Sequence, residues 1–385
     1  MDSRMVPEPL VYRYRPDALW ALKNSELRER LSWYYSVLFN EAPAKYLIAK
    51  RIKSPVDPYE PQVSLEELWK VHDSLSAIFK EEWKRIANGA PLGEVVRPNY
   101  LDVKVAIAKR MMKRCELCEW RCRVNREEKI GVCRVGRECF VYSYFHHLGE
   151  EAPLVPSGTI FYGGCNFRCA FCQNWDISQV KSSRYEVLAP KALAEAQEEL
   201  AIWGARNINH VGGEPTPHIP FILESLLYLD TNVAQLWNSN MYMSREAMKL
   251  LKDVIDIWLP DLKYGNDSCA RRLSGVKNYF AVATRNILEA YEEGEGSVIV
   301  RHLVLPNHLE CCTRPVLRWL AEKVPGAVLN LMDQYRPEYK AAEEPERYPD
   351  ISRRLTREEF RRAVEMAEGL GYRFTQEELM IRRSG

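Results

Sequence analysis

The chain has 385 residues, enough for one large domain and a smaller appendage. Its 54 basic and 53 acidic side chains give a formal net charge of +1, which provides no overall field to attract nucleic acid or an anionic membrane. No basic start followed by an apolar run opens the chain, and no stretch reaches the ~20 apolar residues of a membrane span, so we expect a cytoplasmic protein with neither nucleic acid nor membrane as a partner.

Residues 1–108 contain no cysteine and predict a helical N-terminal region. Ser64 and Glu67 have the spacing of a capping box, in which a hydroxyl and a carboxylate satisfy the free N–H groups at a helix start. Apolar residues then recur at helical spacing, at Leu68, Val71, Leu75 and Ile78. This region gives no sign of catalytic chemistry.

The eleven cysteines are clustered, with five in 115–139 and three in 165–172. Such clusters in a protein of a reducing compartment indicate metal sites and not disulfides. Residues 109–145 form a cysteine-rich segment whose four closely spaced thiols suit a structural zinc, which we favour, or a fully ligated auxiliary iron–sulfur cluster: Cys115, Cys118, Cys122 and Cys133. Cys139 is a candidate for a spare or replacement ligand. Cys269, outside the clusters, is expected to be a small buried hydrophobe.

From residue 146 to 340, strand-like and helix-like segments alternate. The expected strands are 159–163, 207–211, 233–237, 255–259, 298–304 and 327–331, with amphipathic segments such as 191–203 and 244–252 between them. This alternation predicts an α/β fold, a partial (β/α)6 TIM-type barrel with its site at the C-terminal ends of the strands. Residues 341–385 are expected to form a C-terminal helical extension, where Thr356 and Glu359 repeat the capping-box pattern.

Three cysteines in the spacing C-x3-C-x2-C follow the first expected strand, at Cys165, Cys169 and Cys172. Three thiolates on one loop can hold three irons of a [4Fe–4S] cluster and leave the fourth iron for a small molecule. A zinc knuckle with a distant fourth ligand is the alternative. Position favours the cluster, because the loop lies where a parallel barrel places its active site.

The triplet resembles the signature of the radical S-adenosylmethionine (SAM) superfamily. Further stretches resemble the branch related to pyruvate formate-lyase activating enzymes, often called PflX-like, and these are 146–151, 157–161, 172–178, 301–306 and 332–337. The resemblance covers roughly 110–340. It implies a [4Fe–4S] cluster that cleaves SAM reductively to a 5′-deoxyadenosyl radical, which abstracts hydrogen from a substrate. An electron donor such as flavodoxin or ferredoxin is an expected partner.

Polar residues at the ends of later strands are the expected SAM contacts. Gly212 and Gly213 let a ligand approach the backbone, and Glu214 can accept hydrogen bonds from an ammonium group. The family's Gly-Gly-Glu-Pro motif contacts the SAM amine. Lys263 resembles a lysine that contacts the SAM carboxylate, and His302 resembles a SAM-contacting histidine. The remaining candidates at strand ends are Asn238, Ser239 and Asp261.

The substrate stays open. One hypothesis is an activase that abstracts hydrogen from a glycine of a partner glycyl radical enzyme. Another is a radical SAM enzyme that acts on a small molecule or on a different protein residue. A third, a non-catalytic zinc scaffold, is disfavoured by the cysteine triplet and the Gly-Gly-Glu-Pro turn. Asp333, Gln334 and Tyr335 are candidates for the substrate entrance.

Overall fold

Six parallel strands follow one another around the centre of the computed structural model, which describes residues 8–180, 184–293, 297–375 and 379–382. In chain order they are β2 (Ser157–Tyr162), β4 (Asn207–Gly212), β5 (Ala234–Ser239), β6 (Ile257–Pro260), β7 (Ile299–Leu303) and β8 (Val328–Met332). Parallel bridges from Trp258 to Val298 and from Asp261 to Arg301 continue the arc from β6 to β7. The expected partial barrel is therefore confirmed, with strand ends within two residues of those predicted.

Antiparallel strands flank both ends of this arc. β1 (Phe140–His147) pairs with β2, and the short β3 (Glu186–Val187) pairs with β1. At the other end, β10 (Met380–Arg382) pairs with β8 and with β9 (Tyr372–Phe374). In the described part of the chain, β2 and β8 thus pair outward with antiparallel strands instead of with each other, and the barrel is open between them.

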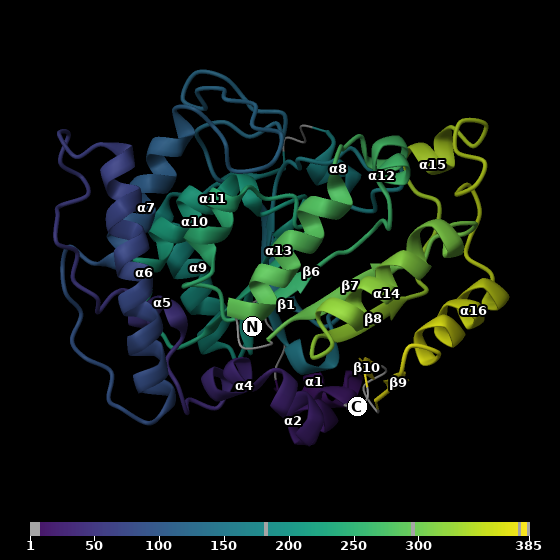
Figure 1. Cartoon of the computed structure of the whole chain (residues 1–385), viewed down its shortest axis with the longest axis horizontal. Helices are drawn as coiled ribbons and strands as arrows, with labels where there is room; N and C mark the ends of the chain where they lie inside the picture. The colour runs from purple at the N-terminus through teal and green to yellow at the C-terminus, as the bar shows by residue number, and fades with distance from the viewer. Residues whose placement is uncertain (1–7, 181–183, 294–296, 376–378, 383–385) are drawn as a thin grey trace.

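Helices connect the parallel strands on the outside of the barrel (Figure 1). They are α9 (Pro190–Ile202), α10 (Ile219–Leu226), α11 (Arg245–Leu251), α12 (Asp267–Ser274), α13 (Tyr279–Glu293) and α14 (Arg314–Lys323). The predicted helices 191–203 and 244–252 correspond to α9 and α11. Because every crossover returns the chain to the same edge, the C-terminal ends of all six strands face one side of the molecule.

The N-terminal region is helical as expected. It comprises α1 (Glu8–Tyr14), α2 (Asp17–Lys23), α3 (Ser25–Arg30), α4 (Ser32–Leu38), α5 (Lys45–Ala49), α6 (Leu65–Ala87) and α7 (Tyr100–Met112). Figure 1 shows α6 and α7 along one side of the barrel, with α1 and α2 beneath it.

The long helix α6 departs from its predicted pattern in two ways. Its buried face continues from Leu68 and Leu75 to Phe79 and Trp83, whereas Ile78 is exposed. This is the drift expected when a straight helix of 3.6 residues per turn is extended beyond two turns. Ser64 accepts a hydrogen bond from the Glu67 amide at 3.1 Å, which is one half of the expected capping box.

Helix α7 ties the N-terminal region to the barrel through a buried polar cluster. Lys104 on α7 lies 3.4 Å from the carboxylate of Asp253, which precedes β6. Tyr100 and Ser76 donate hydrogen bonds to the same carboxylate at 2.6 and 2.8 Å. Buried charges are tolerated only when paired and hydrogen-bonded, so this cluster specifies how the helices pack on the barrel.

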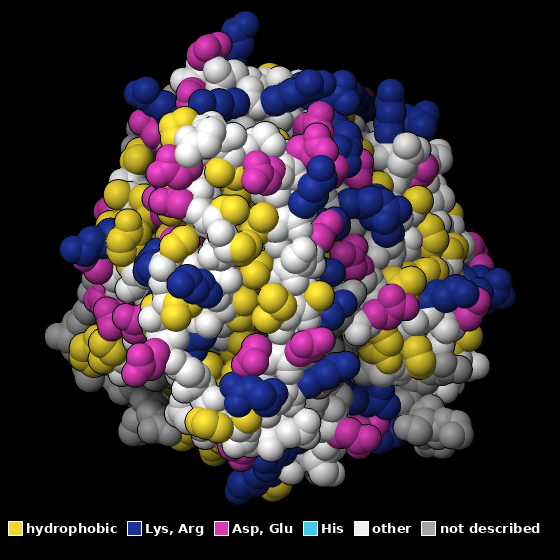
Figure 2. Space-filling model, turned by 60° about the vertical axis from the view of Figure 1, so that its left-hand side comes forward, with side chains coloured by type: hydrophobic (Ala, Val, Ile, Leu, Met, Phe, Trp, Pro, Cys, Tyr) yellow, Lys and Arg dark blue, Asp and Glu magenta, His cyan; other side chains and the backbone are white. Residues whose placement is uncertain are grey.

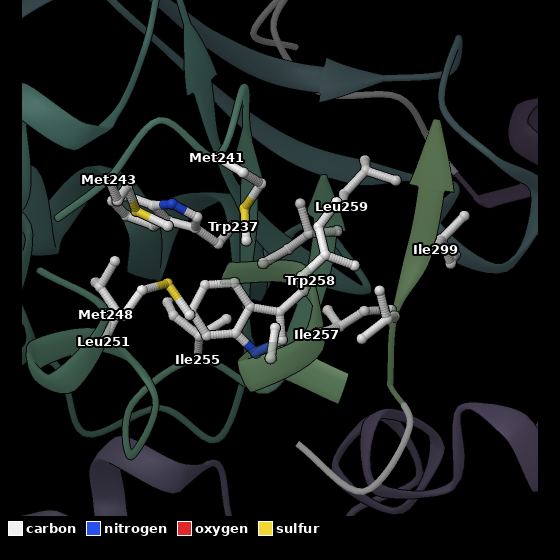
Figure 3. Packing of buried hydrophobic residues seen from close by; sticks show 14 of the residues in the cluster. Trp237, Met241, Met243, Met248, Leu251, Ile255, Ile257, Trp258, Leu259 and Ile299 are labelled. Carbon is white, nitrogen blue, oxygen red and sulfur yellow. The ribbon is translucent and has the colours of Figure 1, made fainter. Parts of the chain in front are cut away.

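Large apolar side chains fill the space between the strands and the helices outside them. Trp237 of β5 and Trp258 of β6 are 0% and 1% exposed. Figure 3 shows them beside Met248 and Leu251 of α11, which pack from the helical side. Burying such side chains contributes on the order of 1.5–3 kcal/mol each. The rigid strands that result hold the polar residues at their C-terminal ends in place.

The C-terminal extension contains α15 (Lys340–Glu343) and α16 (Arg357–Glu368). Thr356 and Glu359 form the predicted capping box at the start of α16. The extension also contains strands that were not predicted, because β9 and β10 follow α16 and join the sheet beside β8. Strands of three residues carry too little pattern to be recognised without their partners.

No helix among the described residues is long and apolar enough to cross a membrane. On the face shown in Figure 2, basic and acidic side chains are interspersed. This mixed surface agrees with the nearly balanced composition.

Candidate functional site

The thiols of Cys165, Cys169 and Cys172 line one cavity of about 260 Å³. The loop that carries them follows β2. The ends of all the other parallel strands supply the remaining walls, through 212–214, 238–240, Asp261, Arg301 and Met332. The structure therefore gathers residues from six strands at the end where a parallel barrel carries its chemistry.

Backbone hydrogen bonds hold the cysteine loop in place. The amides of Arg168 and Ala170 donate to the carbonyls of Ser274 and Leu273, at the end of α12, at 2.9 and 2.8 Å. On its other side, the Cys165 amide donates to the Cys133 carbonyl at 3.1 Å. The loop is thus clamped between α12 and the cysteine-rich segment, so its thiols have fixed directions.

The three thiols are buried or half-buried, and polar groups reach each of them. Cys169 Sγ lies 2.9 Å from Ser274 Oγ, and Cys172 Sγ lies 3.2 Å from Ser178 Oγ. Burial raises the pKa of all three thiols, that of Cys169 to about 11, so the bare thiols are protonated. Metal binding therefore releases protons, and the nearby hydroxyls can donate to the resulting sulfur ligands.

This donor set fits an iron–sulfur cluster. Three soft thiolate ligands converge on one cavity, and that cavity also contains polar groups for a small ligand. Asn238 offers such a group: among the described residues, its Nδ2 is a buried donor without a hydrogen-bond partner. An unsatisfied buried donor that lines a cavity is suited to a ligand oxygen.

Gly212 and Gly213 allow the β4 loop to pack against the cysteine loop. Gly212 has φ +118°, and a Cβ there would lie 2.2 Å from the Tyr162 amide nitrogen. A Cβ on Gly213 would lie 2.1 Å from the Gly164 carbonyl oxygen. Only glycine permits this approach, so the first role of both residues is to bring the two loops together.

Glu214 lines the cavity, but its carboxylate is occupied by its own protein. Thr216 and Ser239 donate their hydroxyls to Oε1 at 2.5 and 2.6 Å, and the Asn240 amide donates to Oε2 at 3.1 Å. Burial raises the pKa of Glu214 while these bonds oppose the rise. Glu214 and Ser239 therefore hold the ends of β4 and β5 together. Of the neighbouring residues Asn238 and Ser239, Asn238 keeps a side-chain donor available for a ligand.

Asp261 and Lys263 form a partly buried pair at the end of β6, with 2.6 Å between Oδ2 and Nζ. Burial opposes charge on Lys263, but the Asp261 carboxylate outweighs it and raises the pKa of Lys263. The ammonium group thus stays charged at the cavity. It is positioned to meet an anionic group of a ligand.

His302 does not reach the cavity, contrary to expectation. Side chains alternate along β7, and Arg301 and Leu303 occupy the cavity side. The ring of His302 lies on the outer side, 2.7 Å from the Leu262 carbonyl through Nδ1 and 3.0 Å from Thr313 Oγ1 through Nε2. Burial lowers the pKa of His302 to about 4, so it is a neutral core histidine.

A second cavity of about 900 Å³ continues from the first into the barrel. The two share several wall residues, namely Gln173, Asn174, Val211, Asn238, Arg301, Met332 and Gln334. Asp333 and Gln334 line the larger cavity as expected, whereas Tyr335 is buried and donates to the Ile351 carbonyl. Arg15 and Asp17 of the N-terminal region also contribute to its wall.

A buried charge cluster in this larger cavity was not predicted from the sequence. Arg301 pairs with Glu150 and with Glu151, the latter at 2.7 Å. Asn209 and Asn330 donate to Glu150 and Glu151 at 2.9 and 2.7 Å. Burial opposes the charge of Glu150, but Arg301 and His147 outweigh it and lower its pKa. Glu150, Glu151 and Arg301 lie in the stretches 146–151 and 301–306 that resemble the activating-enzyme branch, and this resemblance could have indicated them.

The cysteine-rich segment packs directly beside the triplet loop. A Cβ on Gly131 would lie 3.3 Å from Cys133 Sγ and 3.6 Å from Cys122 Sγ, so these two thiols are neighbours. The thiols of Cys115 and Cys122 interact, and burial, together with negative charge on Cys133, raises the pKa of Cys118. Cys122 therefore neighbours both Cys133 and Cys115. Cys139 is buried at the start of β1, and only burial and Arg126 affect its pKa.

The structure is an α/β barrel with a thiol-lined cavity at the C-terminal ends of its parallel strands. A model of the radical SAM superfamily matches residues 159–320, the part of the chain that contains the cysteine loop and the strands from β4 to β7. The chain is 47% identical over 344 residues to the uncharacterized protein MJ0674 of Methanocaldococcus jannaschii, covering 88% of this chain and 97% of that one. A second protein of that organism, MJ0808, is 28% identical over 118 residues, which are 30% of this chain and 34% of that one.

Among solved structures, the chain is similar to SuiB of Streptococcus suis bound to the precursor peptide SuiA. The TM-score is 0.40 with 13% identity over 80% of this chain, and the match spans 61% of the SuiB chain. SuiB bound to S-adenosylmethionine gives a TM-score of 0.33 with 11% identity, over 75% of this chain and 61% of that one.

Proposed function

We propose that this radical SAM enzyme cleaves S-adenosylmethionine at a [4Fe–4S] cluster held by Cys165, Cys169 and Cys172. When bound, the reduced cluster and SAM supply a 5′-deoxyadenosyl radical that abstracts hydrogen from a substrate. One observation carries the proposal: three buried or half-buried thiols on one loop open onto a cavity walled by the ends of the other parallel strands. Cysteine ligands on three irons leave one iron free for a small molecule.

The chain's own residues have separate tasks at this cavity. The unpartnered Asn238 amide can donate to an oxygen of the bound cofactor. Lys263, charged and held by Asp261, can neutralise a carboxylate. Gly212, Gly213 and Glu214 keep the wall in shape, with the first two allowing the close approach of β2 and the cysteine loop. These groups position SAM and exclude water, while the cofactor supplies the reactive species.

The larger cavity is the proposed substrate site. It adjoins the cysteine cavity along a shared wall, and Arg301 is part of both. A hydrogen donor held there would be next to the place where the radical forms, as hydrogen transfer requires contact between the reacting atoms.

Two classes of substrate remain as proposals. An activase that acts on a glycine of a partner protein is suggested by the resemblance to activating enzymes. A small polar molecule, or a different protein residue, is favoured by the charged lining of Glu150, Glu151 and Arg301. A backbone glycine carries no charge for these groups to recognise, so we favour the second class. A flavodoxin or ferredoxin is the proposed electron donor, and zinc or an auxiliary cluster the proposed occupant of the Cys115–Cys133 group.

Anaerobic reconstitution with iron and sulfide, followed by SAM and dithionite, tests the proposal. We expect release of 5′-deoxyadenosine by the wild type and none by Cys169→Ala. Cys139→Ala is the matched control, because it removes a buried thiol outside both cysteine groups and should keep activity. Equal activity of the Cys169 variant would refute the assignment. Deuterium gained by 5′-deoxyadenosine from labelled candidates would identify the hydrogen donor.

A further inference from the structure

A third group of metal-binding side chains lies outside both cysteine clusters. It consists of Cys269, His308, Cys311 and Cys312, whose ligand atoms all lie within 4.8 Å of one another. Cys269 lies in the first turn of α12, and the others lie in or next to the π-helix η3 (Leu309–Thr313), after β7. We propose that these four residues bind one structural zinc ion, separate from the site of SAM cleavage.

The spacing of the ligand atoms matches a tetrahedral zinc site. Zinc bonds of about 2.3 Å to sulfur and about 2.0–2.1 Å to nitrogen imply edges of ~3.8 Å between sulfurs and ~3.6 Å between sulfur and nitrogen. Cys311 Sγ lies 3.8 Å from Cys269 Sγ and 3.9 Å from Cys312 Sγ. His308 Nδ1 lies 3.5, 3.2 and 3.9 Å from the sulfurs of Cys269, Cys311 and Cys312.

The local fold brings four ligands from two segments together. His308, Cys311 and Cys312 stand at positions i, i+3 and i+4, which share one face of a helical turn. Their turn packs against the start of α12, and a Cβ on Gly265 would lie 2.7 Å from the Cys312 carbonyl oxygen. Asn266 caps α12 by accepting from the Cys269 amide at 2.9 Å, which presents Cys269 to the other three.

The groups around the ligands are those of a metal site. His308 Nε2 lies 2.7 Å from Asp350 Oδ2, and since a carboxylate can only accept, this nitrogen carries the proton. Nδ1, which faces the sulfurs, therefore has its lone pair free for a metal. An imidazole oriented by a carboxylate is a common arrangement at zinc sites. Asn266 Nδ2 lies 3.3 Å from Cys269 Sγ and can donate to a thiolate.

Neither a disulfide nor an apolar core accounts for this group as well as zinc does. A disulfide has its sulfurs about 2.05 Å apart, whereas Cys311 Sγ lies 3.8 and 3.9 Å from the sulfurs of Cys269 and Cys312. A simple apolar core, which the sequence suggested for Cys269, would not place a histidine and an asparagine on the thiols. With four protein ligands the coordination is complete, as in structural zinc sites and unlike catalytic ones.

This zinc would brace the helix that holds the active cysteine loop. Cys269 is at one end of α12, and the other end accepts the loop amides through Leu273 and Ser274. Ser274 Oγ also contacts Cys169 Sγ at 2.9 Å. On the far side, Asp350 hydrogen-bonds to His308 from the C-terminal extension. The ion would therefore join α12, the η3 turn and, through Asp350, the C-terminal extension.

Metal analysis of full-length protein, purified anaerobically, tests the proposal. Because the Cys115–Cys133 group is also a zinc candidate, the informative quantity is the difference between variants. We expect Cys311→Ala and Cys269→Ala each to contain one zinc per chain less than the wild type, and Cys139→Ala to match the wild type. Cys311 is exposed, so its replacement should leave the protein folded.

Wild-type protein provides a second, variant-free test. Crystals should show an anomalous peak at the zinc absorption edge among the four side chains. Unchanged zinc in both variants would overturn the proposal, as would iron or a disulfide at this position. These outcomes are independent of 5′-deoxyadenosine formation, so the zinc site and the proposed function can fail separately.

Discussion

The triplet loop and the third thiol group use the same ligand chemistry in opposite ways. Cys165, Cys169 and Cys172 lie within eight residues and open onto a cavity. Cys269, His308, Cys311 and Cys312 come from two separate segments, and they surround a space the size of a single ion. In the proposed roles, the first arrangement would leave the coordination of a bound metal incomplete, and the second would complete it. An accessible cavity beside the ligands, more than the type of ligand, therefore distinguishes a proposed catalytic metal site from a proposed structural one.

The largest expected effect concerns which thiols are needed for turnover. Cys169→Ala should lower 5′-deoxyadenosine formation at least ~1000-fold, or about 4 kcal/mol in the barrier, because a cluster ligand is lost. Cys311→Ala should remain within ~10-fold of the wild type, since it touches only the closed group. Product assays on protein of matched iron content make the comparison. If both variants lose activity alike, the distinction between open and closed groups is wrong.

Arg301 tests whether the charge cluster in the larger cavity is also structural. Arg301→Ala leaves Glu150 and Glu151 buried without their cation, which should cost about 3–5 kcal/mol of unfolding free energy. Denaturant unfolding of the anaerobic protein measures it. The matched control, Arg336→Ala, removes a pair with Glu338 that is half exposed and should cost less than about 1 kcal/mol. Equal losses would show that the cluster is not tightly coupled.

Side chains that orient the ligands should affect each site separately: one change should alter zinc binding, and the other should alter 5′-deoxyadenosine formation. Asp350→Asn should weaken zinc binding by about 10–100-fold and leave the iron content unchanged. Ser274→Ala removes the hydroxyl beside Cys169 and should lower 5′-deoxyadenosine formation by about 10-fold while zinc is retained. Chelator competition and product assays on both variants measure the two effects. If Asp350→Asn lowered product formation while Ser274→Ala lowered zinc binding, the division into two sites would be wrong.

A change at His302 tests whether the outer face of β7 has only a structural role. Its folded pKa of about 4 lies below the unfolded value of about 6.5, so the unfolded chain binds more protons between these values. The contribution to stability is present above pH 6.5 and lost as pH falls toward 4. When the pH falls from 7.5 to 5, the unfolding free energy of His302→Asn should therefore decrease by about 2 kcal/mol less than that of the wild type. Denaturant titrations at both pH values measure it, and a raised KM for SAM would instead restore the predicted cofactor role.

Patterns of a few adjacent residues could be read from the sequence. The strand ranges and the capping box at Thr356 depend on local periodicity and spacing, and the structure agrees with them. The partners of Glu214 and the outward direction of His302 could not be predicted in this way. Both depend on neighbours from other strands, which sequence spacing does not reveal.

The sequence by itself determined the class of fold and the thiol loop, because strand–helix alternation and ligands on one loop are local properties of the chain. Only the tertiary structure decided which polar side chains face the cavity, and it alone brought Glu150 to Arg301 and Cys269 to His308. These pairs are far apart in the chain. Their contacts exist because the barrel and its crossover helices bury them together.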